Sequence, residues 1–440
     1  MSDGAIDLRD PAQARSDAYA QPLETLNPAQ SSLFQADAIW PYFERLRRED
    51  PVHFTPDGDF AAHWSITKYN DIMTVDTNHD VFSSEGGITL PPSQKREEEM
   101  AAEGGGFGEE SLFFKQDAGP QMFIAMDPPK HDVQRKAVSP AVSPHNLAIM
   151  EPLIRERCAA ILDALPIGEP FDWVDKVSME LTAMTLATLF DMPQADRRKL
   201  TRWSDIVMAQ PGHGVVDTWE QKRAEMFEYG SYFLGLWAQR KNGPPGGDLI
   251  SMMAHAEATR DMDQFEYLGN VILLTIGGND TTRNTISGSI YALNKHPDQY
   301  RKLRADPSLI PSMVSETIRW QTPLAHMKRV AKQDFELGGK TIRAGDVVAM
   351  WYVSGNRDDE VIENANDYVI DRPRARQHLS FGFGIHRCVG NRLAELQLRV
   401  IWEEILKRFP DIQVLEEPRR TYSTFVKGYE RMMVNIPTRN

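Results

Sequence analysis

The longest helix candidate of the chain is a segment with helical spacing, residues 262–295. Its middle, VILLTIGG, is apolar on all faces, which is typical of a helix buried in the core of a large domain. Pro297 ends the pattern, because proline cannot continue a helix. No stretch reaches the roughly 18 uninterrupted apolar residues that a membrane span requires. The segment therefore predicts a long central helix, around which the rest of a large fold has to pack.

Shorter helical patterns and a few strand signals account for much of the remaining chain. Helical spacing runs from Pro41, from Glu151 and over residues 391–409. Two short runs on either side of Gly338-Gly339 predict a β-hairpin, and AGDVVAMWYV predicts a turn followed by another strand. The fold class is therefore mainly α with a small β part.

Two parts of the chain depart from this regular pattern. Residues 1–35 are polar with few large apolar side chains, so we expect an N-terminal arm that lies on the surface or is partly disordered. Because no linker or repeat follows, residues 36–440 are expected to form a single domain. Residues 83–119 contain GG, PP, EEE and GGG without a steady period, which predicts a long loop that could serve as a lid.

Charge and cysteine content limit the possible partners and compartments. The 49 Lys and Arg residues against 63 Asp and Glu residues give a net charge of −14, which argues against general binding of nucleic acid or anionic membranes. Cys158 and Cys388 are too few for a disulfide framework or a cysteine-only zinc site. The N-terminus has no apolar secretory signal. We therefore expect a soluble, cytoplasmic protein.

The segment HLSFGFGIHRCVGNRLAEL, which begins at His378, contains the strongest candidate for chemistry. Cys388 lies between Gly384 and Gly390, just before the last predicted helix. A free cysteine is usually a small buried hydrophobe, and we interpret Cys158 in that way. In a tight glycine-rich turn, however, backbone amides and a helix N-terminus would favour a thiolate. Such a thiolate is either a nucleophile or a metal ligand, and spacing alone does not decide between them.

The string FGFGIHRCVG resembles the haem-binding loop of the cytochrome P450 family, F-x-x-G-x-[HR]-x-C-x-G. Phe381, Gly384, His386, Cys388 and Gly390 occupy its fixed positions. The resemblance covers nearly the whole chain from about residue 40. It implies the cytochrome P450 fold, with a long central helix over haem b and the cysteine loop before the last long helix. It also implies that the Cys388 thiolate is the axial ligand of the haem iron.

The string ETIR supplies Glu316 and Arg319, and DRPR supplies Arg372. Taken alone, Glu316 and Arg319 could be an exposed i,i+3 ion pair of little energetic weight. In the family, the corresponding pair is buried and locked to an arginine before the cysteine loop. The resemblance therefore implies a structural role for all three residues.

The string GGNDTT lies in the middle of the predicted central helix and contains Asp280 and Thr281. It could simply be a glycine-weakened helix, at a cost of about 1–2 kcal/mol for the glycine pair. In the family, the segment bulges beside the haem and leaves room for dioxygen. The resemblance implies that Asp280 and Thr281 are the catalytic acid–alcohol pair that delivers protons.

Basic residues in three segments match the donors that hold the haem propionates in the family. They are His131 and Arg135 in DPPKHDVQRK, Arg329 in PLAHMKR, and His386 in the cysteine loop. A solvated basic helix face is the alternative for the first two. Buried carboxylates require such donors. His326 could assist them or could equally be part of the core.

The implied reaction is that of an iron-containing oxidoreductase, a haem monooxygenase that uses O2. Its electrons would come from a ferredoxin and an NAD(P)H-dependent ferredoxin reductase, because two cysteines cannot build a four-cysteine iron–sulfur cluster. Ferredoxins are usually acidic, so docking would need local positive charge. Arg135, Lys136, Arg387 and Arg392 are the candidates.

The substrate-binding positions implied by the resemblance are Leu273, Ile276, Gly277, Leu324 and Phe425. None is charged, which favours a small apolar substrate. The strings RWQTPLAHMKR and STFVKGYERM are particularly similar to those of bacterial alkane and fatty-acid terminal (omega) hydroxylases. The expected reaction is therefore hydroxylation of the terminal methyl of medium-chain alkanes or fatty acids.

Three alternatives remain open. A steroid or terpenoid hydroxylase of the same family has related motifs, and the pocket positions do not exclude a ring system. A haem-thiolate peroxygenase would use hydrogen peroxide and would not need the Asp280–Thr281 pair. A non-catalytic haem protein, such as a gas sensor or an electron carrier, would need neither this pair nor a lid.

Overall fold

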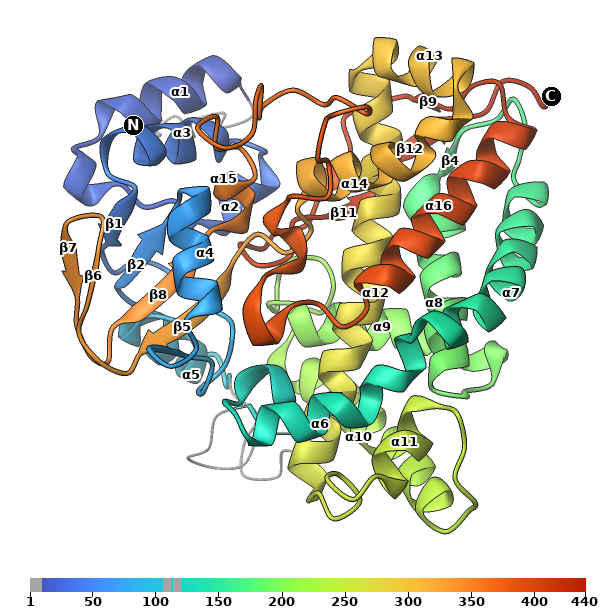
Figure 1. The fold of residues 1–440 in the computed structure, drawn as a ribbon, viewed down its shortest axis with the longest axis horizontal. Helices are drawn as coiled ribbons and strands as arrows, with labels where there is room; N and C mark the ends of the chain where they lie inside the picture. Colours follow the sequence, from blue (N-terminus) through green and yellow to red (C-terminus); the bar gives the residue numbers. More distant parts are fainter. Residues whose placement is uncertain (1–9, 106–111, 114–119) are drawn as a thin grey trace.

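The computed structural model of the chain describes residues 10–105, 112–113 and 120–440 (Figure 1). The longer helices of the described part pack mainly on one side of the molecule. The α-helices are α1 Pro11–Ala20, α2 Ser31–Gln35, α3 Trp40–Glu49, α4 Tyr69–Thr77, α5 Gln94–Ala102, α6 Lys130–Val138, α7 Pro144–Asp163, α8 Met179–Leu189, α9 Arg197–Met208, α10 Trp219–Lys241, α11 Leu249–His255, α12 Gln264–Lys295, α13 Pro297–Ala305, α14 Ile310–Gln321, α15 Tyr352–Gly355 and α16 Asn391–Arg408.

The strands are short and form small sheets. They are β1 Val52–Thr55, β2 His63–Ile66, β3 Phe82–Ser83, β4 Phe171–Asp172, β5 Met327–Ala331, β6 Phe335–Leu337, β7 Lys340–Ile342, β8 Val347–Met350, β9 Gln413–Val414, β10 Arg419–Arg420, β11 Tyr429–Arg431 and β12 Met433–Asn435. The largest sheet has five strands in the order β1-β2-β8-β5-β3, and only the β2–β8 pair is parallel. The mainly α class with a small β part is confirmed, as is the hairpin β6–β7 around Gly338-Gly339.

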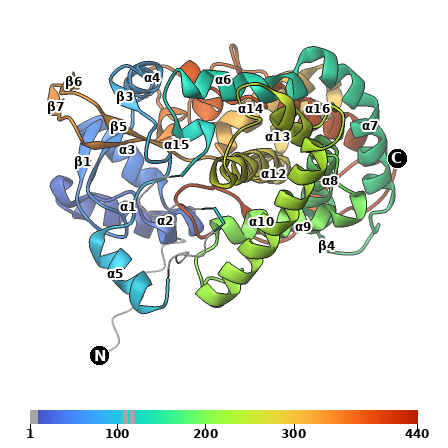
Figure 2. The same ribbon diagram turned by 90° about the horizontal axis from the view of Figure 1, so that it is seen from below.

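Helix α12 is the central element predicted from the sequence. It has 32 residues and begins one residue after Asp263, whose side chain accepts a hydrogen bond from the Glu266 N–H. The ribbon runs through the middle of the molecule in Figure 1, and Figure 2 views it nearly end-on with other helices around it. At Gly269 a Cβ atom would come within 2.2 Å of the Gln121 carbonyl oxygen. A glycine is therefore required for the 120–124 segment to lie against the helix.

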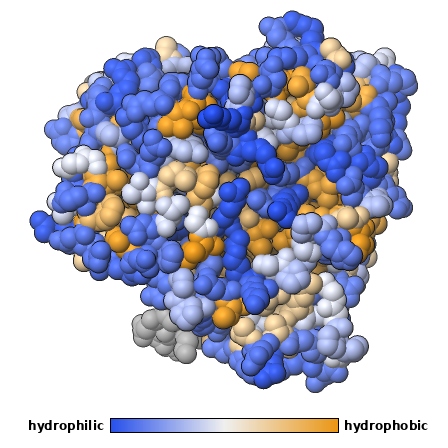
Figure 3. Space-filling model, viewed as in Figure 1, coloured by the Kyte–Doolittle hydropathy of each residue, from blue (hydrophilic) through white to orange (hydrophobic). Residues whose placement is uncertain are grey.

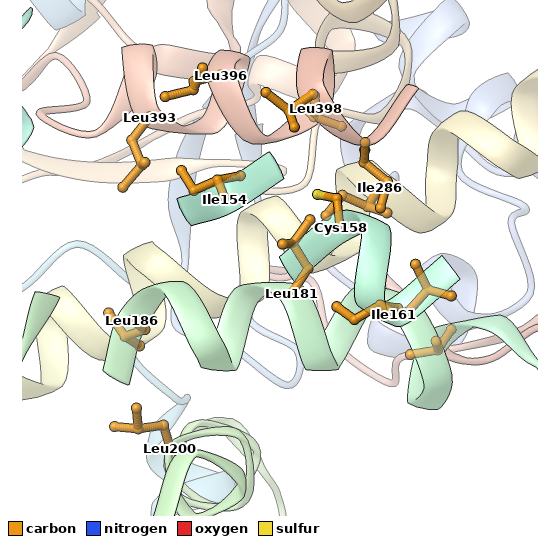
Figure 4. Packing of buried hydrophobic residues seen from close by; sticks show 14 of the residues in the cluster. Ile154, Cys158, Ile161, Leu181, Leu186, Leu200, Ile286, Leu393, Leu396 and Leu398 are labelled. Carbon is orange, nitrogen blue, oxygen red and sulfur yellow. The ribbon is translucent and has the colours of Figure 1, made fainter. Parts of the chain in front are cut away.

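The large hydrophobic core surrounds α12 and includes α7, α8, α14 and α16. Figure 4 shows Cys158 of α7 among Ile154, Leu181, Ile286 and Leu398, and the cysteine side chain is fully buried. Burial raises the pKa of the Cys158 thiol to about 12, so it remains protonated. The assignment of Cys158 to the core is confirmed.

The described part of the expected N-terminal arm, residues 10–35, packs against the rest of the chain through a few buried side chains. Helix α1 packs on α3, and Ala14 and Ala18 are buried. Arg45 of α3 donates hydrogen bonds to the backbone carbonyls of Ala18 and Gln21. This contact uses small side chains and backbone oxygens, so the polar composition of the segment did not reveal it. The division into an arm, residues 1–35, and one domain, residues 36–440, stays a prediction.

The region 83–119 is not an uninterrupted loop. Helix α5 begins after Ser93, whose hydroxyl accepts a hydrogen bond from the Arg96 N–H. The exposed ion pairs of Glu99 with Lys95 and Arg96 support the helix at i,i+4 and i,i+3 spacing. A helix held by a cap and surface pairs has no apolar stripe, and this is why its period was missed. Residues 106–111 and 114–119 of the predicted lid lie outside the described residues.

Within the described ranges, no helix is both long and apolar enough to cross a membrane. The face of the molecule in Figure 3 is mostly hydrophilic, and its hydrophobic residues lie in separate small groups.

Candidate active site

A cavity of about 460 Å³ lies between α12 and the loop that carries Cys388. It includes ten of the residues singled out in the sequence. They are Leu273, Ile276, Gly277, Thr281, Leu324, Phe425, Arg135, Arg329, His386 and Cys388. Most of the other residues that line the cavity are apolar. They come from α8, α9, α12 and α16, from the cysteine loop, and from the segments 87–89 and 120–124, among others. The structure therefore brings these predicted residues to one apolar space, whereas Asp280 and His131 do not line it.

The Cys388 loop is a tight turn directly before α16. The Cys388 N–H donates a hydrogen bond of 2.8 Å to the Phe381 carbonyl. Gly382 and Gly384 have φ values of 63° and 66°, a backbone conformation that L side chains rarely adopt. These contacts leave the cysteine side chain exposed at the cavity.

Two opposing effects act on the Cys388 thiol. Burial among protein atoms raises its pKa, while the Gly390 N–H and the nearby Arg135 and Arg387 lower it. Burial has the larger effect, so the loop alone does not stabilise the thiolate as the sequence analysis expected. Coordination to a metal ion deprotonates a thiol outright. The described residues contain no group of three His, Cys, Asp or Glu side chains that could hold a metal ion. An iron at Cys388 would therefore need its other donors from a cofactor.

Asp280 and Thr281 lie next to each other on α12 but face different surroundings. Thr281 lines the cavity, and its hydroxyl donates a hydrogen bond of 2.9 Å to the Gly277 carbonyl. Asp280 is buried outside the cavity, where its carboxylate accepts a hydrogen bond from Ser204 and pairs with Arg283 at 3.1 Å. Burial raises the pKa of Asp280 to about 6, although Arg283 opposes the shift.

The glycine pair of α12 has two separate explanations. A Cβ atom at Gly277 would meet nothing within 4 Å, whereas one at Gly278 would lie 2.9 Å from Leu186 of α8. Gly277 therefore leaves space in the cavity, and Gly278 allows the close approach of α8. The helix is continuous through this point, so the expected bulge is absent. The space comes from a missing side chain and not from a break in the helix.

Glu316, Arg319 and Arg372 form one buried ion cluster. Arg319 donates to both carboxylate oxygens of Glu316 at 2.7 and 2.8 Å, and Arg372 donates to the same carboxylate at 3.1 Å. Both arginines also donate to backbone carbonyls of the segment 356–367. The geometry agrees with the buried pair implied by the resemblance and excludes the exposed one.

His326 packs in the protein interior beside the cavity. Its ring lies 4.6 Å from that of Trp351 and 5.5 Å from that of Phe425, and Nδ1 is 3.1 Å from the Thr424 carbonyl. Burial lowers the pKa of His326 to about 3. His326 was expected either to assist in binding the propionates or to be part of the core. This position favours a place in the core.

Asp76 of α4 is a residue that the sequence analysis missed. It is fully enclosed, and its carboxylate accepts hydrogen bonds from Arg329 at 3.0 Å, Tyr352 at 2.9 Å and the Phe383 N–H at 2.8 Å. It therefore connects a predicted cofactor-binding arginine to the cysteine loop. The sequence contains a feature that could have identified this residue. Asp76 follows Ile72 at i,i+4, so it lies on the buried face of an amphipathic helix, where an acidic residue is unusual.

Comparisons with known proteins agree with this geometry. A family model described as Cytochrome P450 matches residues 244–435. Linalool 8-monooxygenase of Pseudomonas putida is 34% identical over 400 residues, which cover 89% of this chain and 94% of that protein. The chain belongs to the cytochrome P450 family.

Two further P450s are similar over most of the chain. The methyl-branched lipid omega-hydroxylase of Mycobacterium tuberculosis is 31% identical over 405 residues, 89% of this chain and 90% of that protein. The solved structure of CYP153D17 from Sphingomonas sp. PAMC 26605 has 48% sequence identity and a TM-score of 0.82, and the match covers 92% of this chain and 98% of that one. The chain therefore has the P450 fold, and the cofactor of this fold is haem b with a cysteine thiolate as axial ligand.

The residues around the cavity fit this cofactor. His131 Nε2 and both ring nitrogens of His386 are buried without a hydrogen-bond partner, and the two rings lie 4.3 Å apart. Arg135 and Arg329 line the cavity close to them. Unsatisfied donors of this kind are costly unless an acceptor reaches them. These four residues would hold the two propionates, and Cys388 would bind the iron, because Cys158 is enclosed in the core.

We expect Asp76→Ala to destabilise the P450 by roughly 3–5 kcal/mol, because it removes the buried carboxylate that accepts hydrogen bonds from Arg329, Tyr352 and the Phe383 N–H. The free energy of unfolding of the holoprotein in urea measures the effect. Asp71→Ala on the same helix is the matched control. Asp71 is only half-buried, so its replacement should change the value by less than about 1 kcal/mol. Equal losses in both variants would contradict the role given to Asp76.

Proposed function

We propose that this P450 hydroxylates the terminal methyl group of medium-chain alkanes or fatty acids. The observation that carries the proposal is the chemistry of the cavity wall. Among the described lining residues, only Arg135 and Arg329 carry a full charge, and both lie with the residues that would hold the cofactor. The remaining wall suits a hydrocarbon chain. The relative named as a lipid omega-hydroxylase supports terminal attack.

Terminal attack depends on orientation. Internal C–H bonds are weaker, so the chain end reacts first only if the cavity keeps the inner carbons away from the reacting centre. Leu324 and Phe425 are well suited to this task. A β-bridge joins Leu324 to Val426, and the Ala325 N–H donates to the Phe425 carbonyl at 2.9 Å. Two apolar walls from distant parts of the chain are thereby fixed relative to one another, in the same cavity that Gly277 lines.

The protein's own contribution to the reaction is to hold the substrate and to deliver protons. When haem b is bound, it supplies dioxygen activation, and the thiolate ligand favours O–O cleavage. The Thr281 hydroxyl lies at the cavity, where its oxygen can accept a hydrogen bond from a water molecule, and it can donate one there when it turns away from the Gly277 carbonyl. Asp280, with a pKa of about 6, can gain and lose a proton near neutral pH. Asp205, which is partly exposed and pairs with Arg283 at 2.9 Å, connects this acid to the surface.

We expect Thr281→Ala to retain consumption of NAD(P)H but to lower severalfold the fraction that yields product, with the rest lost as hydrogen peroxide. General acid–base groups typically contribute about 10²–10⁴-fold to a rate, so loss of the hydroxyl should redirect most turnovers. Product and peroxide are measured together against NAD(P)H. Thr281→Ser retains the hydroxyl and should retain most of the coupling. Full coupling in Thr281→Ala would show that the hydroxyl takes no part in proton delivery.

The electron donor proposed for this P450 is a ferredoxin with its NAD(P)H-dependent reductase. Lys136, Arg387 and Arg392 are exposed around the cysteine loop, and Arg135 donates to the Arg387 carbonyl. A positive surface at this point suits an acidic carrier. Turnover with a surrogate ferredoxin and reductase, and not with hydrogen peroxide alone, is the expected result. The reverse result would favour a peroxygenase.

The test of the proposed substrate class is mass analysis of products from a mixture of alkanes, fatty acids and sterols. We expect terminal alcohols from the linear substrates, and Leu324→Ala should raise the share of subterminal alcohols. A loss of only about 1 kcal/mol in orientation changes a product ratio roughly fivefold. Leu415→Ala, at an exposed leucine, is the control. Products from sterols alone would overturn the proposal, and an unchanged ratio in Leu324→Ala would remove Leu324 from the substrate wall.

A further inference from the structure

A second cavity, of about 300 Å³, lies apart from the one that contains Cys388 and shares none of its lining residues. Its wall comes from the start of α3, the end of α12, the end of α14, the segment after α15 and the C-terminal segment around β10 and β11. Six of its residues carry the argument. They are Asp37, Trp40, Trp320, Arg357, Arg420 and Lys427. The cavity is thus a meeting point of segments that are distant in the sequence.

One of the three cations in this wall is already neutralised. Arg420 pairs with Glu417 at 2.6 Å and with Asp37 at 3.2 Å. It also donates to the Tyr291 hydroxyl at 3.2 Å. Both nearby carboxylates are therefore in contact with this arginine.

The other two cations have only backbone carbonyls as polar partners in the described structure. Arg357 donates to the carbonyls of Asn366 at 2.8 Å and Trp320 at 3.2 Å, and Lys427 donates to that of Gln321 at 3.1 Å. Neither forms an ion pair with any described carboxylate. Arg357 is only 6% exposed and Lys427 only 8%. Buried charges without a counter-charge are costly. An anion bound between Arg357 and Lys427 would offset this cost.

Two indole rings bring these cations to one place. The Arg357 guanidinium carbon lies 4.5 Å from the centre of the Trp40 ring and 5.3 Å from that of Trp320. The Lys427 nitrogen lies 5.3 and 5.9 Å from the same two rings. Cation–π contacts compensate part of the desolvation of each cation. They do not remove the repulsion between two like charges that share the same pair of rings.

The electrostatics of Lys427 agree with a missing counter-ion. Burial, together with the nearby Arg357 and Arg420, lowers the pKa of Lys427 to about 7, and Asp37 opposes this shift. Burial and Arg319 likewise lower the pKa of Arg357 to about 9, although the nearby carboxylates of Asp37 and Glu316 oppose the shift. His296 also lines the cavity, and burial and Arg357 lower its pKa below the ordinary 6.5. The cavity therefore favours the binding of negative charge over the gain of further protons.

We propose that the second cavity binds a small oxyanion, a carboxylate or a sulfate- or phosphate-like group, between Arg357 and Lys427. The guanidinium group and the ammonium group are the side chains that recognise such anions in proteins. The bound anion would join the segment after α15, which carries Arg357, to the C-terminal segment, which carries Lys427. Lys427 lies two residues after Phe425, which lines the first cavity. The same ligand would thus stabilise one wall of the substrate site.

The first test measures sulfate binding to the holoprotein by calorimetry and thermal unfolding, because sulfate keeps its charge between pH 6.5 and 8.5. We expect saturable binding and a rise in unfolding temperature on the order of 3 °C near saturation. Acetate, measured in parallel, distinguishes a site for carboxylates from one for tetrahedral anions. Absence of saturable binding of both ions at pH 6.5 would overturn the proposal.

The matched variants are Lys427→Gln and Lys95→Gln, which remove one positive charge each. Lys95 lies on α5 with 85% of its side chain exposed. Lys95→Gln should bind sulfate as the unchanged protein does, and Lys427→Gln should lose at least tenfold in affinity. General stabilisation by a strongly hydrated salt does not saturate and would affect both variants alike. Equal affinity in the two variants would contradict the assignment of the site.

A pH series on the unchanged protein is independent of whether Lys427→Gln folds. Between pH 6.5 and 8.5, Lys427 passes from mostly charged to mostly neutral, whereas His296 remains mostly neutral throughout. The affinity for sulfate should therefore fall roughly tenfold over this interval. A constant affinity would show that Lys427 does not contribute its charge to the anion.

Discussion

The structure depends on keeping one cysteine sulfur at the edge of an apolar cavity, opposite a long buried helix. Two glycines with positive φ turn the chain before Cys388, and a hydrogen bond to the Phe381 carbonyl closes the turn. The loop alone does not favour the thiolate, because burial raises the thiol pKa. Binding of the cofactor iron would favour the ionised sulfur, and the fold provides its position.

Buried charges hold this loop from two sides. Asp76 binds Arg329 and the loop backbone at Phe383, while the Glu316 cluster fixes the segment 356–372 that leads toward the loop. Burying such groups is costly unless every one is paired. These paired buried groups fix the segments around the cavity. A cavity large enough for a cofactor can therefore stay open within a close-packed interior. The second cavity differs from this pattern, since two of its cations lack a carboxylate.

Features with a local or periodic pattern could be predicted from the sequence. The apolar period gave α12 and α16, the glycine pair at 338 gave the β6–β7 hairpin, and the motif around Cys388 led to the cavity. Contacts made by polar residues between distant segments were not predictable. Asp76 was a single acid on a helix face, α5 had no apolar stripe, and α1 packs through alanines and carbonyls. Arg357 and Lys427 lie 70 positions apart, and only the fold places them over the same indoles.

The most direct test of the account is the absorption spectrum of the reduced, carbon-monoxide-bound holoprotein. The spectrum distinguishes a thiolate from a neutral axial ligand on the haem iron. The unchanged protein and Cys158→Ser should both give the thiolate signature, because Cys158 is enclosed in the core, and Cys388→Ser should lose it. A thiolate spectrum that survives in Cys388→Ser would contradict the central claim, as would its absence from the unchanged protein.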